Sequence, residues 1–177
     1  MTSFIIKAHT DRPVAEAWKA DPDCPFCRII RGDAQAFLLY ENDLVTSFLD
    51  ILPLRPGHAL VVPKTHYARV SELPPESAAA VGMAVSTVAR AMTEALQNTA
   101  LNVVCNQEYA QAVPHVHYHI IPAPRPGSSE PTSDTAKVDH VVKPLTQKEM
   151  HKMETESRDE LDDEEAKVLA EKIRARL

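Results

Sequence analysis

The chain has 177 residues, of which 44% are hydrophobic, and a net charge of −6 at pH 7. This length and composition suit one globular domain with a real core, and the negative charge argues against holding long nucleic acid by blanket phosphate neutralisation. No apolar run reaches membrane-spanning length, and the first seven residues are too short and too soon charged for a signal peptide. We therefore expect a soluble protein of the cytoplasm, or of cytoplasm and nucleus, with no membrane partner.

Four segments of the chain differ in composition. Residues 1–23 form an N-terminal arm with little pattern, and residues 24–123 carry nearly all of the strand and helix signals. Residues 124–154 are rich in proline and serine, which is typical of a flexible surface segment. Residues 155–177 have the pattern of a charged helix. We predict one folded domain over residues 24–123, with an arm before it and a linker and helix after it.

Three cysteines are present, and two of them, Cys24 and Cys27, form a Cys-x-x-Cys pair. An odd number suits a reducing compartment better than a disulfide framework. Three readings stay open for the pair: a zinc site, a redox-active dithiol, or unpaired structural thiols. Cys105 lies in an apolar run and is expected to be a small buried residue.

Five strands and a long helix are predicted within the folded domain. Apolar runs bounded by proline, glycine, asparagine or aspartate indicate strands at residues 37–41, 44–51, 58–63, 101–106 and 114–122. A short helix after Cys27 ends at Gly32. The long helix runs from Pro75 to about Asn98, because apolar residues recur along it at steps of three and four, at Val81, Val85, Val88, Met92 and Leu96. We expect an α+β fold in which this helix packs on an antiparallel sheet of about five strands.

The predicted C-terminal helix carries acidic residues early and basic residues late, an order that complements the helix dipole. A thin apolar edge runs along it, at Leu169, Ile173 and Leu177. Three placements stay open: the helix packs on the domain, on a partner subunit, or on nothing.

Three histidines recur at every second position between Pro114 and Pro122, with apolar residues between them. In an extended strand, side chains two apart point to the same face. We expect His115, His117 and His119 to form a row with about 7 Å between neighbours, while the residues between them face the core. Such a row of imidazoles can hold a metal ion or act on a phosphate group.

A tetrahedral zinc site needs two ligands besides Cys24 and Cys27. His66, after the third predicted strand, and His115, at the start of the histidine row, are the candidates. With all four positions taken by protein, the ion has no open position for substrate or water. Its work is then structural, because it ties the N-terminal segment to the sheet beside the histidine row.

The run from Gln111 to Ile121 resembles the alternating histidine signature of the histidine-triad (HIT) superfamily of nucleotide hydrolases and transferases. Three upstream blocks, at residues 24–32, 48–51 and 56–66, resemble the family in the same order. The resemblance covers about residues 24–122 and is nearest to the zinc-bearing phosphoramidase-like or fragile-histidine-triad-like branch. It implies a two-fold homodimer with the long helix at the interface.

The resemblance also implies roles for single residues. His117 matches the nucleophile that attacks the α-phosphate and becomes nucleotidylated, and His119 matches the ring beside the scissile phosphate and the leaving group. Asp50 matches the acid that binds the ribose hydroxyls. His58 matches a histidine that contacts the catalytic groups rather than the substrate.

Further matches concern the nucleotide and the metal. Ile29 and Ile51 match apolar walls around the base. Asn106 matches a strand-end amide that contacts phosphate or ribose, and Gln111 lies in the loop beside the phosphate. The zinc-bearing members have four ligands, which match Cys24, Cys27, His66 and His115.

Two features depart from the family pattern. Ala112 stands where many members have a serine or threonine whose hydroxyl reaches the phosphate, which implies a different rate or leaving-group preference. The loop at residues 106–111 lacks the glycines that are usual there, so its backbone path stays open.

The resemblance implies an enzyme that cleaves a substituted α-phosphate of a purine nucleotide through a nucleotidyl-histidine and releases a nucleoside monophosphate. The substrate is a nucleoside phosphoramidate or a dinucleoside polyphosphate. The alternative is a nucleotide-binding interaction or signalling module with weak residual activity. DNA-end processing is disfavoured, because the chain after Pro122 has no cysteine for a zinc finger and an acidic helix that repels phosphates.

Overall fold

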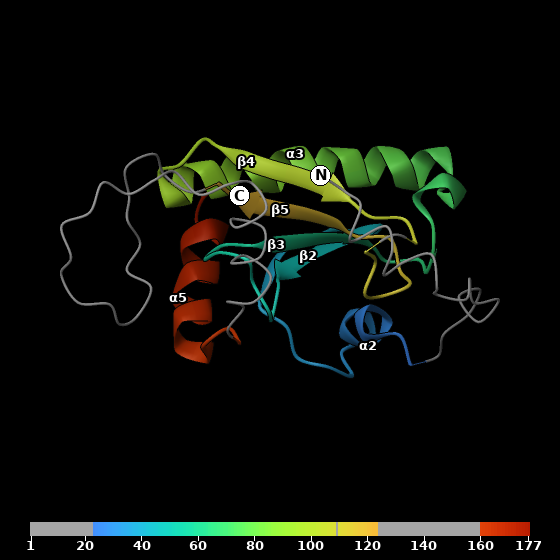
Figure 1. Ribbon diagram of the computed structural model, residues 1–177, viewed down its shortest axis with the longest axis horizontal. Helices are drawn as coiled ribbons and strands as arrows, with labels where there is room; N and C mark the ends of the chain where they lie inside the picture. The colour runs from blue at the N-terminus through green and yellow to red at the C-terminus, as the bar shows by residue number, and fades with distance from the viewer. Residues whose placement is uncertain (1–22, 109, 124–159) are drawn as a thin grey trace, which may run out of the picture.

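The computed structural model describes residues 23–108, 110–123 and 160–177 (Figure 1). Its strands are β1 (Leu38–Glu41), β2 (Val45–Leu49), β3 (Ala59–Pro63), β4 (Leu101–Cys105) and β5 (Tyr118–Pro122). Its helices are α2 (Pro25–Arg31), the short 3-10 helix η2 (Val70–Glu72), α3 (Pro75–Leu96) and α5 (Asp163–Arg174). The strands form one antiparallel sheet in the order β1-β2-β3-β5-β4. The predicted α+β fold is confirmed.

The predicted segments before and after the domain fall mostly outside this description. The N-terminal arm, apart from Asp23, and the proline- and serine-rich linker lie outside the described residues, as do residues 155–159 of the predicted C-terminal helix.

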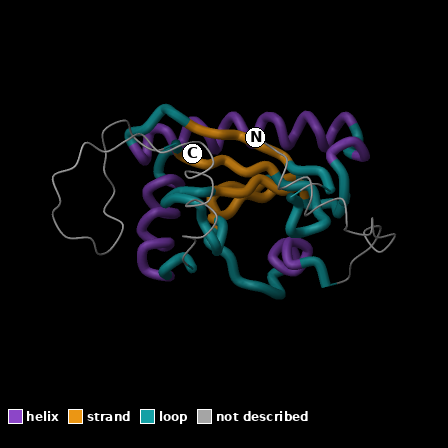
Figure 2. The backbone as a smooth tube through the Cα atoms, viewed as in Figure 1, coloured by secondary structure: helices purple, strands orange, loops and turns teal. Residues whose placement is uncertain are grey.

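The long helix α3 covers one face of the sheet (Figure 2). Of the predicted stripe, Val81, Val88 and Met92 are fully buried, while Val85 is partly buried against the same core. Four alanines between these positions are also buried, at Ala80, Ala84, Ala91 and Ala95. These small side chains let the helix lie close to the strands. Although α3 has 22 residues, none of the described helices combines the length and apolar character needed to cross a bilayer.

The short helix α2 covers the opposite face of the sheet. Phe26 packs there with Phe48, Leu60 and Val62, whereas the neighbouring residues of β3 face α3. Every residue of β2 and β3 is buried for this reason. The helix ends as predicted at Gly32, whose φ of 81° is left-handed and whose N–H bonds to Ile29 at 3.0 Å.

The C-terminal helix α5 packs on the domain, which decides among the three placements left open by its sequence. Ala166, Ala170 and Ile173 are fully buried in the core that α3 also covers. Arg174 donates from Nη1 to the carbonyl of Leu38 in β1 at 3.1 Å. In Figure 1 this helix stands beside one end of the sheet, away from α2.

Candidate active site

The three histidines of the predicted row lie on two kinds of backbone. His119 lies in β5, whereas His115 and His117 lie in the segment that leads into it. The expected strand therefore begins late, because the N–H of Val116 bonds to Tyr67 at 2.7 Å instead of joining the sheet. The ring centroids of His117 and His119 are 4.8 Å apart, closer than the ~7 Å repeat of a regular strand.

The histidines lie between the sheet and α2. His119 pairs with Leu60 of β3, and cross-strand partners share a face. Leu60 belongs to the cluster around Phe26, so this is the α2 face. The Phe26 ring meets the His117 ring edge-on, with 5.2 Å between centroids.

His117 is held in one tautomer by the backbone. Its Nδ1 lies 2.6 Å from the carbonyl oxygen of His115. A carbonyl oxygen only accepts, so Nδ1 carries the proton and donates it, and Nε2 keeps its lone pair. The ring is 3% exposed, and burial lowers its pKa below the usual value. The ring is therefore neutral at pH 7, which is the form in which histidine acts as a nucleophile.

A chain of hydrogen bonds also fixes the tautomer of His119. The N–H of Leu54 donates to Nδ1 of His58 at 3.1 Å, so the proton of this neutral ring lies on Nε2. Nε2 of His58 lies 2.9 Å from Nδ1 of His119 and donates to it. The proton of His119 is then on its own Nε2, which makes that nitrogen a donor.

The carboxylate of Asp50 adjoins this pair. Its Oδ1 accepts from the N–H of Leu52 at 2.9 Å, and its Oδ2 lies 3.5 Å from Nδ1 of His58. Asp50, His58 and His119 bring one potential ligand atom each within 4.8 Å of one another. Their facing ring nitrogens are joined by a hydrogen bond, however, so this arrangement does not favour a metal ion.

A second cluster unites all four residues predicted as zinc ligands. Nδ1 of His115 lies 3.5 Å from Sγ of both Cys24 and Cys27. Nδ1 of His66 lies 3.3 Å from Sγ of Cys27. All four ligand atoms lie within 4.8 Å of one another, and Cys24 and His115 are fully buried. The cluster can hold a metal ion.

The cluster has the dimensions of a tetrahedral site. Zinc bonds of about 2.3 Å to sulfur and 2.0 Å to nitrogen place neighbouring sulfur and nitrogen ligands about 3.5 Å apart. Nε2 of His115 donates to the carbonyl of Pro63 at 2.8 Å, which leaves the lone pair of Nδ1 toward the two thiols. Burial lowers the pKa of His115 to about 4, so the ring is neutral. Nε2 of His66 is buried and has no hydrogen-bond partner among the described residues.

A pocket of about 440 Å³ opens beside α2. The two residues predicted to contact a base, Ile29 and Ile51, both line it. Ile51 is 61% exposed and directly follows Asp50. An apolar pocket next to a carboxylate suits a planar base joined to a ribose. Asp163 of α5, which the sequence did not suggest, lines the same pocket.

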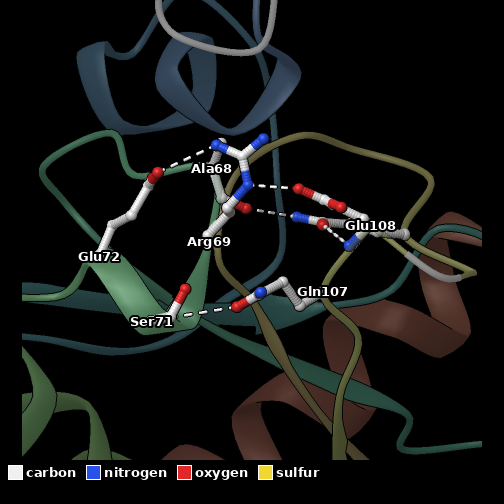
Figure 3. A network of polar contacts seen from close by, with 7 residues as sticks. Ala68, Arg69, Ser71, Glu72, Gln107 and Glu108 are labelled. Atoms are coloured by element: carbon white, nitrogen blue, oxygen red, sulfur yellow. Dashed lines mark hydrogen bonds and ion pairs between the residues drawn. The ribbon is translucent and has the colours of Figure 1, made fainter. Parts of the chain in front are cut away.

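The loop after β4 is tied to the segment around η2 (Figure 3). Arg69 forms ion pairs with Glu108 and, at 2.9 Å, with Glu72. The N–H of Ser71 donates to the side chain of Gln107 at 3.2 Å. These contacts hold a loop that leads directly to the histidine row.

Two other polar residues of this loop already make hydrogen bonds to the backbone. Gln111 is buried, donates to the carbonyl of Ala68 at 2.9 Å and accepts from the N–H of Glu108 at 2.7 Å. Asn106 donates to the carbonyl of Ala110 at 3.4 Å. The predicted contacts of Gln111 and Asn106 with a nucleotide stay predictions, and the Gln111 amide already has partners at both ends.

The missing glycines of this loop are replaced by strained residues. Glu108 and Ala110 have φ angles of 60° and 53°, in the left-handed region that favours glycine. The loop therefore keeps a glycine-like path, and Arg69 holds the side chain of Glu108. No local sequence pattern predicts the role of Arg69. Phe26 could be singled out from the sequence, because it lies between the two cysteines.

A sheet that presents a neutral histidine pair beside a Cys2His2 cluster defines a protein of the histidine-triad class. The family model of the HIT domain matches residues 31–125. The chain belongs to this family.

Two relatives show what kind of protein it resembles. Adenosine 5'-monophosphoramidase hnt1 of Schizosaccharomyces pombe is 44% identical over 102 residues, which cover 57% of this chain and 74% of that protein. Adenylylsulfatase HINT3 of Arabidopsis thaliana is 40% identical over 102 residues, which cover 56% of this chain and 52% of that protein. Just over half of the plant protein therefore has a counterpart here.

Solved structures show the same fold. A Hit-like protein from Bartonella henselae superposes with a TM-score of 0.65 at 30% identity, covering 89% of this chain and 98% of that one. A zinc-bound histidine triad family protein from Mycobacterium smegmatis superposes with a TM-score of 0.63 at 29% identity, covering 86% and 91%.

Proposed function

We propose that the chain is a nucleotidyl hydrolase or transferase that cleaves a substituted α-phosphate of a purine nucleotide through a nucleotidyl-histidine at His117. The observation that carries the proposal is the bond from Nδ1 of His117 to the His115 carbonyl, which leaves a lone pair on Nε2 of a buried, neutral ring. Relatives named as an adenosine 5'-monophosphoramidase and an adenylylsulfatase, at 44% and 40% identity, support nucleotide hydrolysis.

The reaction has two steps. Nε2 of His117 forms a bond to the α-phosphorus while the bond to the leaving amine or phosphate breaks, and the leaving group takes up a proton from solvent. Nε2–H of His119 donates a hydrogen bond to the charge that develops there. Water then attacks the phosphorus, the bond to His117 breaks, and a nucleoside monophosphate leaves as a proton returns to solvent.

The nucleotide lies across the α2 face in this proposal. Ile29 and Ile51 hold the base, since both line the pocket, and Asp50 accepts from the ribose hydroxyls. Asn106 contacts ribose or phosphate from the end of β4. Gln111 acts indirectly, because its amide bonds hold the loop.

Trapping of the covalent intermediate tests the mechanism. Adenosine 5'-phosphoramidate and diadenosine tetraphosphate are each mixed with the protein, quenched in alkali and followed by intact mass. The wild-type chain is expected to gain one adenylyl group, His117→Ala to gain none while still binding AMP, and His140→Ala, outside the catalytic set, to behave as wild type. An adduct of equal yield in His117→Ala would exclude His117 as the nucleophile. Tight AMP binding without turnover would favour the interaction module.

The ion of the Cys2His2 cluster is zinc in this proposal. Cys24, Cys27, His66 and His115 are its ligands, and two thiolates with two imidazoles are a set that zinc prefers. Four protein ligands leave no open position, so the ion supplies stability rather than chemistry.

Two copies of the chain form a homodimer in the cytoplasm in this proposal. β4 is the last strand in the sheet order, so one of its edges has no neighbouring strand among the described residues. Met83 on α3 and Val103 on β4 are 66% and 44% exposed. A monomer mass at micromolar concentration in light scattering would contradict the dimer.

A further inference from the structure

The pocket for the base includes an element beyond the part of the chain that defines its family. The family match ends at residue 125, whereas Asp163, the first residue of α5, lines the pocket together with Ile29 and Ile51. The C-terminal helix therefore contributes to a pocket whose other walls, residues 29–51, lie in the family match or directly before its start at residue 31.

The start of α5 is fixed in position beside this pocket. The N–H of Leu161 donates to the carbonyl of Ile51 at 3.0 Å, which ties the helix to a wall of the pocket. Asp162 caps the helix, because its Oδ1 accepts from the N–H groups of Glu164 and Glu165 at 3.0 Å each. The backbone that carries Asp163 is thus anchored on both sides.

Asp162 and Asp163 are neighbours with different surroundings. The Asp162 carboxylate is used by the helix cap. Of the described residues that line the pocket, Asp163 alone is charged, and Gln35 is the other polar side chain. An ionised carboxylate accepts hydrogen bonds and donates none. A base that offers an N–H group to this carboxylate would satisfy it, and a base that offers none would not.

We propose that Asp163 selects purine nucleotides whose base carries an amino group, and this inference rests on the proposed function. The 6-amino group of adenine donates to the carboxylate, whereas unsubstituted purine, which has only C–H at position 6 and no proton on N1, offers it no donor there. Asp163 is exposed, so water competes for the contact. The preference for AMP over purine riboside 5'-monophosphate is therefore about tenfold, the scale of one hydrogen bond to a charged group in an open site.

Calorimetric titration of the full chain with AMP and with purine riboside 5'-monophosphate tests this proposal, because the two ligands differ only at position 6 of the base. The wild-type ratio of dissociation constants is expected to be about ten, and Asp163→Ala brings it close to one, since the methyl side chain accepts no hydrogen bond. Asp162→Asn is the matched control: it removes the same charge one residue away, keeps a good cap and keeps the wild-type ratio.

The outcomes separate this proposal from the one on which it rests. Equal affinity of the wild-type chain for AMP and purine riboside 5'-monophosphate would overturn the role of Asp163 and leave the proposed hydrolase intact. An equal change of the ratio in Asp163→Ala and Asp162→Asn would show that only the loss of negative charge matters, and it would also overturn the role of Asp163. If neither nucleotide binds, both proposals fail. Thermal unfolding of each variant checks that α5 stays folded.

Discussion

His115 and His117 are two residues apart, and their neutral rings are held in opposite tautomers. His115 donates a hydrogen bond from Nε2 to the carbonyl of Pro63 and presents the lone pair of Nδ1 to two thiols. His117 donates a hydrogen bond from Nδ1 to the carbonyl of His115 and keeps a lone pair on Nε2. The side chain is the same in both, and the backbone acceptor beside each ring decides which nitrogen is available.

The two environments share one packing residue. The ring of Phe26 lies 5.9 Å from the ring of His115 and 5.2 Å from that of His117, between centroids, and contacts both edge-on. Phe26 belongs to the same helix as Cys27. Disruption of the Cys2His2 cluster is therefore expected to disturb the His117 ring through packing, while loss of the His117 ring is expected to leave the cluster in place.

The largest expected effect separates the two histidines. His117→Ala should lower turnover by at least about 10⁴-fold, because the proposed nucleophile is lost, and lower the free energy of unfolding only through the cavity it leaves. His115→Ala should lower the free energy of unfolding by about 3 kcal/mol or more, since it leaves a cavity of the same kind and also removes a proposed metal ligand. Urea unfolding and initial rates measure the pair. Equal losses of stability in both variants would break the comparison.

Removal of the proposed metal ion is expected to give the next largest effect. A chelator should lower the melting temperature of the wild-type chain by roughly 10 °C, the equivalent of about 3 kcal/mol at this size. His117→Ala should respond to the same extent, whereas Cys24→Ser should melt lower from the start and respond little. Native mass spectrometry should find one zinc ion per chain in the first two and none in the third. A full chelator response in Cys24→Ser would remove Cys24 from the site.

The sequence was sufficient for the order of strands and helices and for the identity of the clustered residues. The three-residue and four-residue steps of α3 predict its buried stripe, but they do not predict that the neighbouring alanines are buried, because alanine is found on all faces of helices. The sequence predicts the apolar edge of α5, but it does not predict which part of the protein that edge packs against. Packing against α3 depends on Ala166 and Ala170, which are buried only because this core happens to face them.

The tautomers of the histidines were beyond sequence reasoning. They depend on backbone groups at Pro63, Leu54 and His115, whose positions follow from the tertiary fold. The ion pair between Arg69 and Glu108 was equally hidden, because it joins residues 39 apart in the chain with no periodic signal. Sequence patterns predict features that recur at regular spacing, whereas each of these hydrogen bonds and ion pairs occurs only once in the chain.

Loss of the hydrogen bond from His58 to His119 is expected to have a smaller effect, which concerns turnover and not nucleotide binding. His58→Phe should lower kcat by about 10- to 100-fold, because His119 no longer keeps its proton on Nε2 and the developing charge loses a donor. The dissociation constant for AMP should stay within about twofold, since His58 does not contact the nucleotide in this proposal. His58→Gln should recover part of the rate, because its amide can donate to His119 and accept from Leu54.

A merely structural role of His58 would give a different result. It would lower kcat and AMP affinity together, the glutamine would rescue neither, and the effect would not depend on the leaving group. The positioning role predicts a smaller loss with the p-nitrophenyl ester of AMP, whose leaving group needs little stabilisation, than with the phosphoramidate.

The smallest expected effect concerns the loop that precedes both histidines. Ala110 has a φ of 53°, a conformation that costs a residue with a Cβ about 1 kcal/mol. Ala110→Gly relieves this strain but gives the unfolded chain more freedom, so we expect the free energy of unfolding to rise by less than about 1 kcal/mol. Ala112 is exposed in the same loop and lacks a positive φ. Ala112→Gly should therefore lower stability by about 0.5 to 1 kcal/mol.

The turnover of these two variants tests whether the strained loop serves the Cys2His2 cluster or the position of His117. If Arg69 and its ion pair hold the loop only so that the chain can reach His115, relief at Ala110 changes stability and leaves kcat and metal content unchanged. If the strain positions His117 for attack, kcat falls while zinc stays bound. The first result would link the loop to His115 and the cluster, and the second would link it to His117. A loss of stability in Ala110→Gly as large as that in Ala112→Gly would show that Ala110 does not hold the left-handed conformation in solution.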